Sequence, residues 1–255
     1  MKEIQGSKNS LIKELRKLHQ KKYRDRQNRY LIEGFHLVEE GMKAQAEIEM
    51  LLLTEKGITE WGEWLASQRC EQYLITEELM ASLSDLPTPP GIIAVIQKPQ
   101  VNQEITKGRW LLLDRVQDPG NVGTMVRTAD AAGFDGVVLG EGCADLYSTK
   151  VLRSMQGSHF HLPVVSGILS EVILHCQKNA IPVYGTELNE EAKAFQKVAV
   201  REEVALIMGN EGQGVAKELL AMTDGNLYIP IYGQAESLNV GVAAGILMYH
   251  FRSKI

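Results

Sequence analysis

The chain has 255 residues, enough for one large domain or two ordinary ones, each with a full hydrophobic core. Hydrophobic residues make up 44% and charged residues 23% of the sequence, as in globular proteins. No uninterrupted apolar run approaches the roughly 20 residues that span a bilayer, and we expect no signal peptide at the N-terminus. The three widely spaced cysteines indicate reduced thiols in a cytoplasmic protein instead of a disulfide framework or a zinc site.

The net charge of −5 is unevenly distributed along the chain. Residues 1–30 contain ten basic and three acidic side chains, so this segment carries +7 and the rest of the chain −12. A basic segment on an acidic body indicates a docking surface for a polyanion. A solvated helix would show the same charges, and composition alone leaves both readings open.

The first part of the chain predicts a compact α/β domain over residues 1–97. Leu11, Leu15 and Leu18 recur at helical spacing within residues 9–22, with basic residues between them. Strand patterns are expected near residues 30–35, 49–54, 72–76 and 91–96, and a helix near 36–43. The polar segment 98–108 is expected to be a linker.

The remaining residues, 109–255, alternate short apolar strands with helices. Strands are expected near residues 110–114, 136–140, 162–165, 181–185, 204–209 and 227–231, and helices near 121–132, 169–178, 216–222 and 238–251. This alternation predicts a parallel sheet covered by helices on both faces. Ligands in such sheets bind beyond the carboxyl ends of the strands, where the polar and glycine-rich loops of this chain fall.

The first of these loops leads into a helix that carries an arginine. Apolar residues at i, i+3, i+4 and i+7 from Val122 form a buried stripe, while Gly120, Gly123 and Arg127 lie on another face. Arginine offers several donors in one plane and suits phosphate. Asn121 could cap the helix or hold the loop. A plain Asp-Pro-Gly turn followed by a surface arginine is the alternative.

The second loop has the glycine order G-x-x-G-x-G over residues 209–214. This is not the G-x-G-x-x-G order of dinucleotide sites, so a nicotinamide-dependent oxidoreductase is disfavoured. Glycines there would let a ligand approach the backbone closely, beside the carboxylate of Glu211. A strand-to-helix turn with no ligand would also explain them.

The third loop follows the apolar stretch Ile229-Pro-Ile and contains Ser237 and Asn239, at the start of a helix rich in small residues. Serine and asparagine are strong N-cap residues, so helix capping is one explanation for them. The other is that the loop holds a ligand or a reacting group.

Together the three loops form a specific pattern: Asp-Pro-x-Asn-x-Gly-x-x-x-Arg-Thr-Ala, then Gly-Asn-Glu-Gly-x-Gly, then Ile-Pro-Ile…Glu-Ser-Leu-Asn-Val. This pattern closely resembles the three motifs of the SpoU (TrmH-like) branch of the SPOUT RNA methyltransferases. The resemblance covers residues 109–255, and Gly157 fits the linking motif of that family, although Met155 stands where many relatives have serine. Residues 1–97 resemble, less specifically, the L30e-like domain that often precedes the catalytic domain.

The resemblance implies transfer of a methyl group from S-adenosylmethionine to a ribose 2′-hydroxyl of structured RNA, with rRNA favoured over tRNA. It also implies a deep C-terminal trefoil knot and a homodimer formed through the knotted domain. The small residues of the last helix, Gly241, Ala243, Ala244 and Gly245, could pack between two chains or within one. A non-catalytic RNA-binding protein with the same fold is the rival interpretation, but all three motifs are intact.

Site residues follow from the resemblance position by position. The catalytic set is Arg127, Asn121, Glu211, Ser237 and Asn239. The cofactor-binding set is Met208, Gly209, Ile229, Leu238 and Asn239. The expected RNA contacts of the basic segment are Lys8, Lys13, Arg16, Lys17, Lys21, Lys22, Arg24 and Arg26.

Two further groups of residues carry weaker signals. His159 and His161 alternate, so on a strand they would share a side. No acid or cysteine stands near them at a ligand spacing, and we expect no metal site. Tyr23 and Tyr30 lie among the basic residues and could stack on unpaired bases, or be ordinary core or surface residues.

Overall fold

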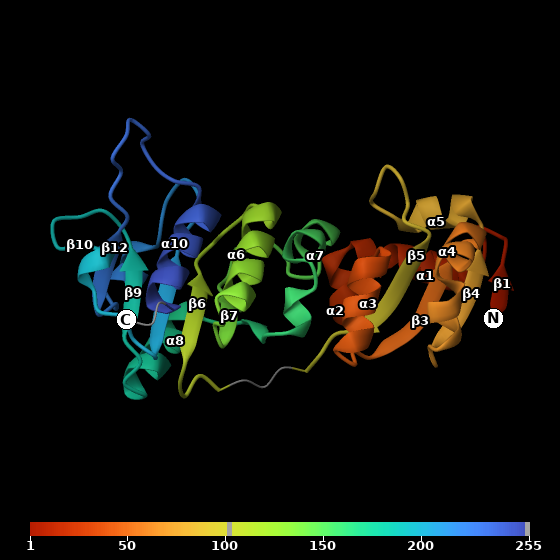
Figure 1. The fold of residues 1–255 in the computed structure, drawn as a ribbon, viewed down its shortest axis with the longest axis horizontal. Helices are drawn as coiled ribbons and strands as arrows, with labels where there is room; N and C mark the ends of the chain where they lie inside the picture. The colour runs from red at the N-terminus through yellow and green to blue at the C-terminus, as the bar shows by residue number, and fades with distance from the viewer. Residues whose placement is uncertain (101–103, 253–255) are drawn as a thin grey trace. The chain divides into compact units, whose positions relative to one another are not determined.

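The computed structural model describes residues 1–100 and 104–252, which form two compact units (Figure 1). The first unit contains residues 1–100 and 147–160, and the second contains 104–146 and 161–252. The sequence assigns residues 147–160 to the catalytic domain, whereas the structure packs them with the first unit. Residues 101–103 of the expected linker lie outside the described residues.

The first unit is built on a mixed five-stranded sheet. Its elements are β1 (Lys2–Ile4), α1 (Ser10–Arg16), the 3-10 turn η1 (Lys17–His19), α2 (Lys21–Gln27), β2 (Arg29–Glu33), α3 (Phe35–Lys43), β3 (Ile48–Leu53), α4 (Glu55–Ala66), β4 (Glu71–Ile75), α5 (Glu77–Leu83), β5 (Ile92–Gln97), α7 (Thr149–Met155) and η2 (Ser158–Phe160). The strand order is β1-β4-β3-β5-β2. Strands β1, β4 and β3 run parallel, and β5 is antiparallel to both of its neighbours.

The predicted helix over residues 9–22 forms in the structure as α1 followed by η1. Asn9 caps it, since its Oδ1 accepts from the Leu11 amide at 2.9 Å. Gln20 is extended (φ −98°, ψ 129°), and it separates η1 from α2. Leu15 and Leu18 are nevertheless buried as their spacing predicts, in a core with strands β3 and β5 and helix α5.

Three contacts fix residues 147–160 to the first unit. The ring of Tyr147 lies 4.5 Å from that of Tyr30, and the Tyr30 hydroxyl lies 3.1 Å from His159 Nε2. Thr149 Oγ1 donates to Asp85 at 2.7 Å. Tyr30 is fully buried, so it is a core residue and cannot stack on RNA.

The second unit is built on a parallel seven-stranded sheet. Its elements are β6 (Arg109–Leu113), α6 (Pro119–Ala131), β7 (Gly136–Leu139), β8 (Val164–Ser166), α8 (Leu169–Lys178), β9 (Val183–Thr186), β10 (Lys193–Ala194), η3 (Phe195–Lys197), β11 (Val204–Met208), α9 (Lys217–Leu220), β12 (Gly225–Tyr228) and α10 (Val240–Arg252). The strand order is β10-β12-β9-β11-β6-β7-β8, and every pairing is parallel.

This sheet confirms the predicted architecture of the second half. Every residue of β11 and of β7 is buried, as expected for strands covered on both faces. Trp110, Ile173 and Ile207 lie in the core between the sheet and α8. Within the described residues, no helix combines the length and apolar character needed to cross a lipid bilayer.

Helices α6 and α10 pack directly against each other (Figure 1). A Cβ atom on Gly241 would lie 3.4 Å from Thr124 Cγ2, and one on Gly245 would lie 3.6 Å from Thr128 Cγ2. These are ordinary contact distances, so the helices pack within the chain, which is one of the two uses expected from the sequence, without requiring glycine against α6 at either position.

Candidate active site

The loops that follow β6 and β11 begin side by side. Leu113 pairs with Met208 at the carboxyl ends of these adjacent parallel strands, and the Asp114 amide donates to the Met208 carbonyl at 2.8 Å. Asp118 caps α6 by accepting from the Asn121 amide at 2.9 Å, with Pro119 as the first helical residue. Asn121 is therefore not the cap of this helix, and its side chain is available for other contacts.

Glu211, in the loop after β11, accepts three hydrogen bonds from the loop after β6. The donors are the Gln117 amide at 3.2 Å, the Asp118 amide at 3.1 Å and Asn121 Nδ2 at 3.0 Å. Partial burial raises the pKa of the Glu211 carboxyl, but the hydrogen bonds from Asn121 and the backbone amides outweigh it and leave that pKa below its usual value. Glu211 is thus an ionised link between two loops.

Asn239 continues this link to the third loop. Its Nδ2 donates to Asn121 Oδ1 at 3.0 Å, and its Oδ1 accepts from the amides of Gly241 and Val242 at 2.9 and 3.3 Å. The direction of the chain of bonds is fixed at both ends, because a carboxylate only accepts and backbone amides only donate. Asn239 therefore caps α10 and holds a neighbouring loop at the same time.

The structure thus brings together three of the five expected catalytic residues in one relay, Glu211–Asn121–Asn239. Arg127 and Ser237 are exposed, and neither has a hydrogen bond or ion pair within the described part of the chain. Arg127 lies six positions after Asn121 on α6, about 9 Å further along the helix axis. Within the described residues, Glu211 and Asn121 hold the loops, and neither has a hydrogen bond or ion pair with Arg127.

The third loop presents an unpaired backbone beside apolar side chains. Strand β12 ends at Tyr228, so the strand expected to reach residue 231 is too long by three residues. None of the backbone amides or carbonyls of residues 229–238 is hydrogen-bonded within the described residues. Ile231 and Leu238 are 39% and 37% exposed. Free main-chain donors next to uncovered apolar surface suit an adenine ring, so this loop fits the expected cofactor.

Contacts within the chain explain why residue 209 is a glycine. A Cβ atom there would lie 2.2 Å from both the Gly214 carbonyl carbon and the Val215 nitrogen. Asn210, which follows Gly209, exchanges backbone hydrogen bonds with Gly214. The tight turn after β11 therefore requires glycine at position 209 whether or not a ligand binds.

Two residues outside the expected site sets, Asp114 and Asn210, tie the first two loops together. The Asp114 carboxylate accepts from the Ala216 amide at 2.7 Å, and Asn210 Nδ2 donates to the Arg115 carbonyl at 2.8 Å. Asn210 Oδ1 also accepts from the amides of the next loop residues. Asp114 directly follows a buried strand and Asn210 lies within the Gly-Asn-Glu-Gly motif, so both had a signal in the sequence.

The basic N-terminal segment is mostly exposed, with one correction. Lys13, Lys17 and Lys22 are exposed, and the ammonium groups of Lys17 and Lys22 lie 5.7 and 4.9 Å from the Tyr23 ring. The other exposed cations are Lys8, Lys21 and Arg26, while Arg16 is half-buried. Arg24 is only 4% exposed and donates to the Leu18 carbonyl at 2.7 Å. The expectation that Arg24 contacts RNA is wrong, because its side chain lies inside the fold.

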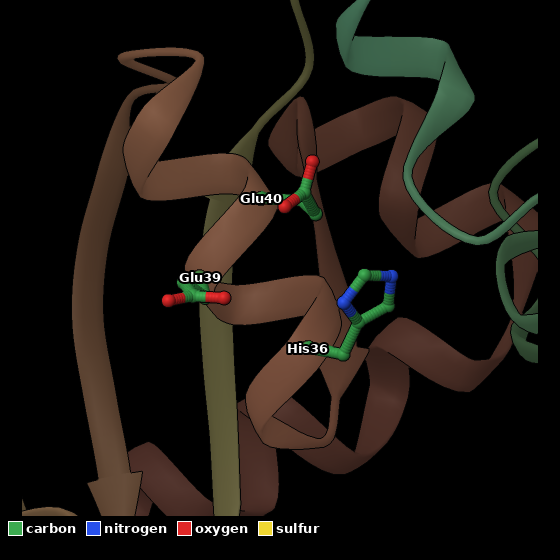
Figure 2. A group of neighbouring side chains, drawn as sticks. All are labelled: His36, Glu39 and Glu40. Carbon is green, nitrogen blue, oxygen red and sulfur yellow. The ribbon is translucent and has the colours of Figure 1, made fainter.

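One group of side chains within the described residues has metal-ligand spacing: His36, Glu39 and Glu40 on α3 (Figure 2). The Lys43 ammonium lies 3.0 Å from Glu39 and 3.1 Å from Glu40, so these carboxylates already share a cation. His159 lies in the 3-10 turn η2 (Ser158–Phe160), so His159 and His161 do not share one side of a strand. Their rings have different partners, and His161 binds Asp130 at 2.9 Å.

Known proteins match this chain along most of its length. The SpoU rRNA Methylase family matches residues 108–249, and the MRM3-like substrate binding domain matches residues 9–94. The chain is 46% identical to the 23S rRNA (guanosine(2553)-2′-O)-methyltransferase RlmP of Bacillus subtilis strain 168, over 99% of this chain and 100% of that protein. It is 28% identical to the 23S rRNA (uridine(2479)-2′-O)-methyltransferase of Streptomyces viridochromogenes, over 89% and 83%.

Solved structures agree with these matches. The AdoMet-bound rRNA methyltransferase from Sinorhizobium meliloti superposes with a TM-score of 0.86 at 28% identity, over 98% of this chain and 97% of that one. The SpoU methyltransferase AviRb from Streptomyces viridochromogenes, also in complex with AdoMet, gives a TM-score of 0.83 at 26% identity, over 96% and 98%. The chain therefore belongs to the SpoU rRNA methylase family and is an S-adenosylmethionine-dependent RNA 2′-O-ribose methyltransferase.

Proposed function

We propose that this enzyme methylates the ribose 2′-hydroxyl of a guanosine in 23S rRNA. The 46% identity to RlmP over the whole of both chains supports this substrate above the uridine acted on by the more distant relative. The relay Glu211–Asn121–Asn239 is the structural observation that supports methyl transfer at this place, because it assembles one site from three loops, whereas the choice of guanosine rests on the identity to RlmP. An rRNA substrate also agrees with the expected cytoplasmic location.

The proposed cofactor site lies where the loops after β11 and β12 begin. Met208, Gly209, Ile229, Leu238 and Asn239 would hold S-adenosylmethionine, with main-chain groups on the adenine edge and apolar side chains on its faces. When bound, this cofactor supplies an electrophilic methyl group on a sulfonium. The residues of the chain hold the RNA hydroxyl in line with that group.

Arg127 has the properties of an RNA phosphate clamp. Its guanidinium is exposed and uncommitted within the described residues, and arginine stays protonated at neutral pH. We propose that it grips the phosphate beside the target ribose and orients the 2′-hydroxyl, whose proton passes to that phosphate or to a water. Position and orientation can supply much of the reduction in barrier for such a reaction.

The other expected catalytic residues have supporting roles. Glu211 and Asn121 keep the first two loops in register, and Asn239 connects them to α10. Ser237 is exposed two residues before Asn239, where its hydroxyl can reach the ribose or the cofactor. In the first unit, Lys13, Lys17 and Lys22 supply phosphate contacts that hold the RNA body and weaken with added salt.

The homodimer and the trefoil knot remain part of the proposal. Val242 and Tyr249 of α10 are 53% and 52% exposed, and Ile246 between them is half-buried, so one face of this helix is apolar and uncovered. These residues are spaced at i, i+4 and i+7 and lie on a different face from Gly241 and Gly245, which contact α6. A second copy of the chain would cover this face.

Mapping 2′-O-methylation in rRNA tests the proposed substrate. Total rRNA from cells with and without the protein would be compared nucleotide by nucleotide. We expect one 23S guanosine to lose its ribose methyl group in cells without the protein, and to regain it on incubation with purified enzyme and cofactor. A lost methyl on tRNA alone, or on a uridine, would exclude this substrate.

Arg127→Ala tests the clamp. We expect turnover to be nearly abolished while calorimetry shows cofactor binding mostly intact, because Arg127 lies about 9 Å along α6 from the relay. Arg127→Lys keeps the charge without the planar fork, and Arg201→Ala removes another exposed arginine as a control. Methyl transfer by Arg127→Ala at a rate near that of the wild type would exclude the role.

A further inference from the structure

Arg115 has an unusual backbone conformation for its residue type. It follows β6 with φ 52°, in the left-handed region that non-glycine residues rarely adopt. The preceding residue, Asp114, has a side chain that is only 7% exposed. A strained conformation of this kind persists where surrounding contacts fix it, often beside a functional site.

The guanidinium of Arg115 joins two loops. Its Nε and Nη2 donate to the two carboxylate oxygens of Asp114 at 3.1 and 3.2 Å, and its Nη1 donates to Gln213 Oε1 at 3.2 Å. The backbone of the same residue contributes as well, because its carbonyl accepts from Asn210 Nδ2 at 2.8 Å. Arg115 in the loop after β6 therefore holds the loop after β11 through both its side chain and its main chain.

These contacts surround Glu211 in sequence. Asn210 directly precedes Glu211, and Gln213 follows it by two positions, so both flanks of the glutamate are attached to Arg115. On the other loop, the amides of Gln117 and Asp118 that donate to Glu211 follow Arg115 by two and three positions. The turn at Arg115 thus determines where both halves of the Glu211 contact lie.

We propose that Arg115 is a positioning residue for methyl transfer, acting through the amides that it directs toward Glu211. The inference rests on the proposed function and deepens it. Three of the five N–H donors of the guanidinium are committed to Asp114 and Gln213, so its observed contacts lie within the protein. Its effect reaches the reacting groups through Glu211, Asn121 and Asn239.

Arg115→Gly is the most informative variant. Glycine adopts φ 52° without strain, so the turn can remain when the guanidinium is lost, whereas Arg115→Ala loses the same guanidinium and keeps the strained φ that arginine has in the wild type. Single-turnover methylation of 23S rRNA from cells lacking the protein would be measured. We expect a rate about tenfold lower for Arg115→Gly, corresponding to roughly 1.4 kcal/mol of lost positioning, with unchanged RNA affinity.

Two matched variants control this result. Arg115→Lys keeps a positive charge beside Asp114 but not the fork that also reaches Gln213, so we expect it to recover part of the rate. Arg201→Ala removes an exposed arginine of the same unit that has no partner within the described residues, and we expect no change.

A second readout needs no RNA. The pKa of Glu211 would be measured by ¹³C NMR on glutamate-labelled protein, with the resonance assigned from Glu211→Gln. We expect that pKa to rise in Arg115→Gly, because the amides of Gln117 and Asp118 are no longer held toward the carboxylate. The Asp114 carboxylate, without its cationic partner, would also raise the pKa of Glu211. The double variant Asp114→Asn/Arg115→Gly removes that negative charge, and we expect the pKa of Glu211 to remain raised in it.

Two results would overturn the proposal. One is an unchanged methylation rate in Arg115→Gly, and if RNA binding is weaker in that case, Arg115 is an RNA contact. The other is a Glu211 pKa that stays at its wild-type value in the double variant. Failure of the wild-type enzyme to methylate 23S rRNA would instead reject the proposed substrate, while the NMR measurement would still test Arg115.

Discussion

Replacing Asn121 with aspartate tests the relay with a minimal change of shape. The donor Nδ2, which lies 3.0 Å from Glu211 Oε1, becomes a carboxylate oxygen facing another carboxylate. At that separation, two unit charges in water repel by about 1.4 kcal/mol. Loss of the hydrogen bond adds about 1 kcal/mol, so the loops should separate with a penalty of roughly 2 kcal/mol.

That penalty corresponds to roughly a thirtyfold fall in the population of the joined arrangement. Single-turnover transfer of a radiolabelled methyl group to 23S rRNA at neutral pH would measure it. Asn189→Asp is a control of the same chemistry, because Asn189 also donates to a glutamate, Glu187 at 2.6 Å, and lies exposed outside the relay. If Asn121→Asp keeps the wild-type rate, or if Asn189→Asp loses as much, the relay does not organise the site.

Four further predictions each concern a single residue. The folded-state pKa of Glu211 lies below its ordinary value of 4.5, so its stabilising hydrogen bonds are fully present above that pH and are lost as the pH falls through the lower, folded-state pKa. The melting temperatures of wild type and Glu211→Gln should therefore converge in acid. Arg24→Met should destabilise the fold by roughly 1–3 kcal/mol in thermal unfolding, because the buried Leu18 carbonyl loses its hydrogen-bond donor. Lys22→Ala, in contrast, should weaken RNA binding and reduce its salt dependence without lowering the melting temperature. Gly209→Ala should weaken cofactor binding in calorimetry, because a Cβ there overlaps the backbone of the following turn.

The periodic segments were predictable because a single physical pattern determines them. The buried runs of β6 and β11 and the helical spacing of α8 were all visible, and α8 spans the expected residues 169–178. The stretch Ile229-Pro-Ile shows the limit of this reasoning. Its apolar residues resemble a buried strand, but they form a loop with Ile231 partly exposed, since apolar surface at a ligand site need not be covered by the chain.

The motifs select candidate site residues, but they do not indicate which of these side chains contact one another. Which side chains meet depends on the alignment of Leu113 with Met208 and on the left-handed turn at Arg115, and neither leaves a signature in the sequence. A basic run likewise does not reveal which arginine is buried, as Arg24 shows. Residues 147–160 pack with the first unit although they are far from it in sequence, and no local sequence pattern indicates such a contact.

Mass spectrometry of nucleosides tests the central claim most directly. Purified enzyme would be incubated with 23S rRNA from cells lacking the protein and with S-adenosylmethionine carrying a trideuterated methyl group, and the RNA would then be digested. We predict labelled 2′-O-methylguanosine with the wild-type enzyme and almost none with Arg127→Ala. Label on a base instead of a ribose, or equal labelling by the two proteins, would contradict the account.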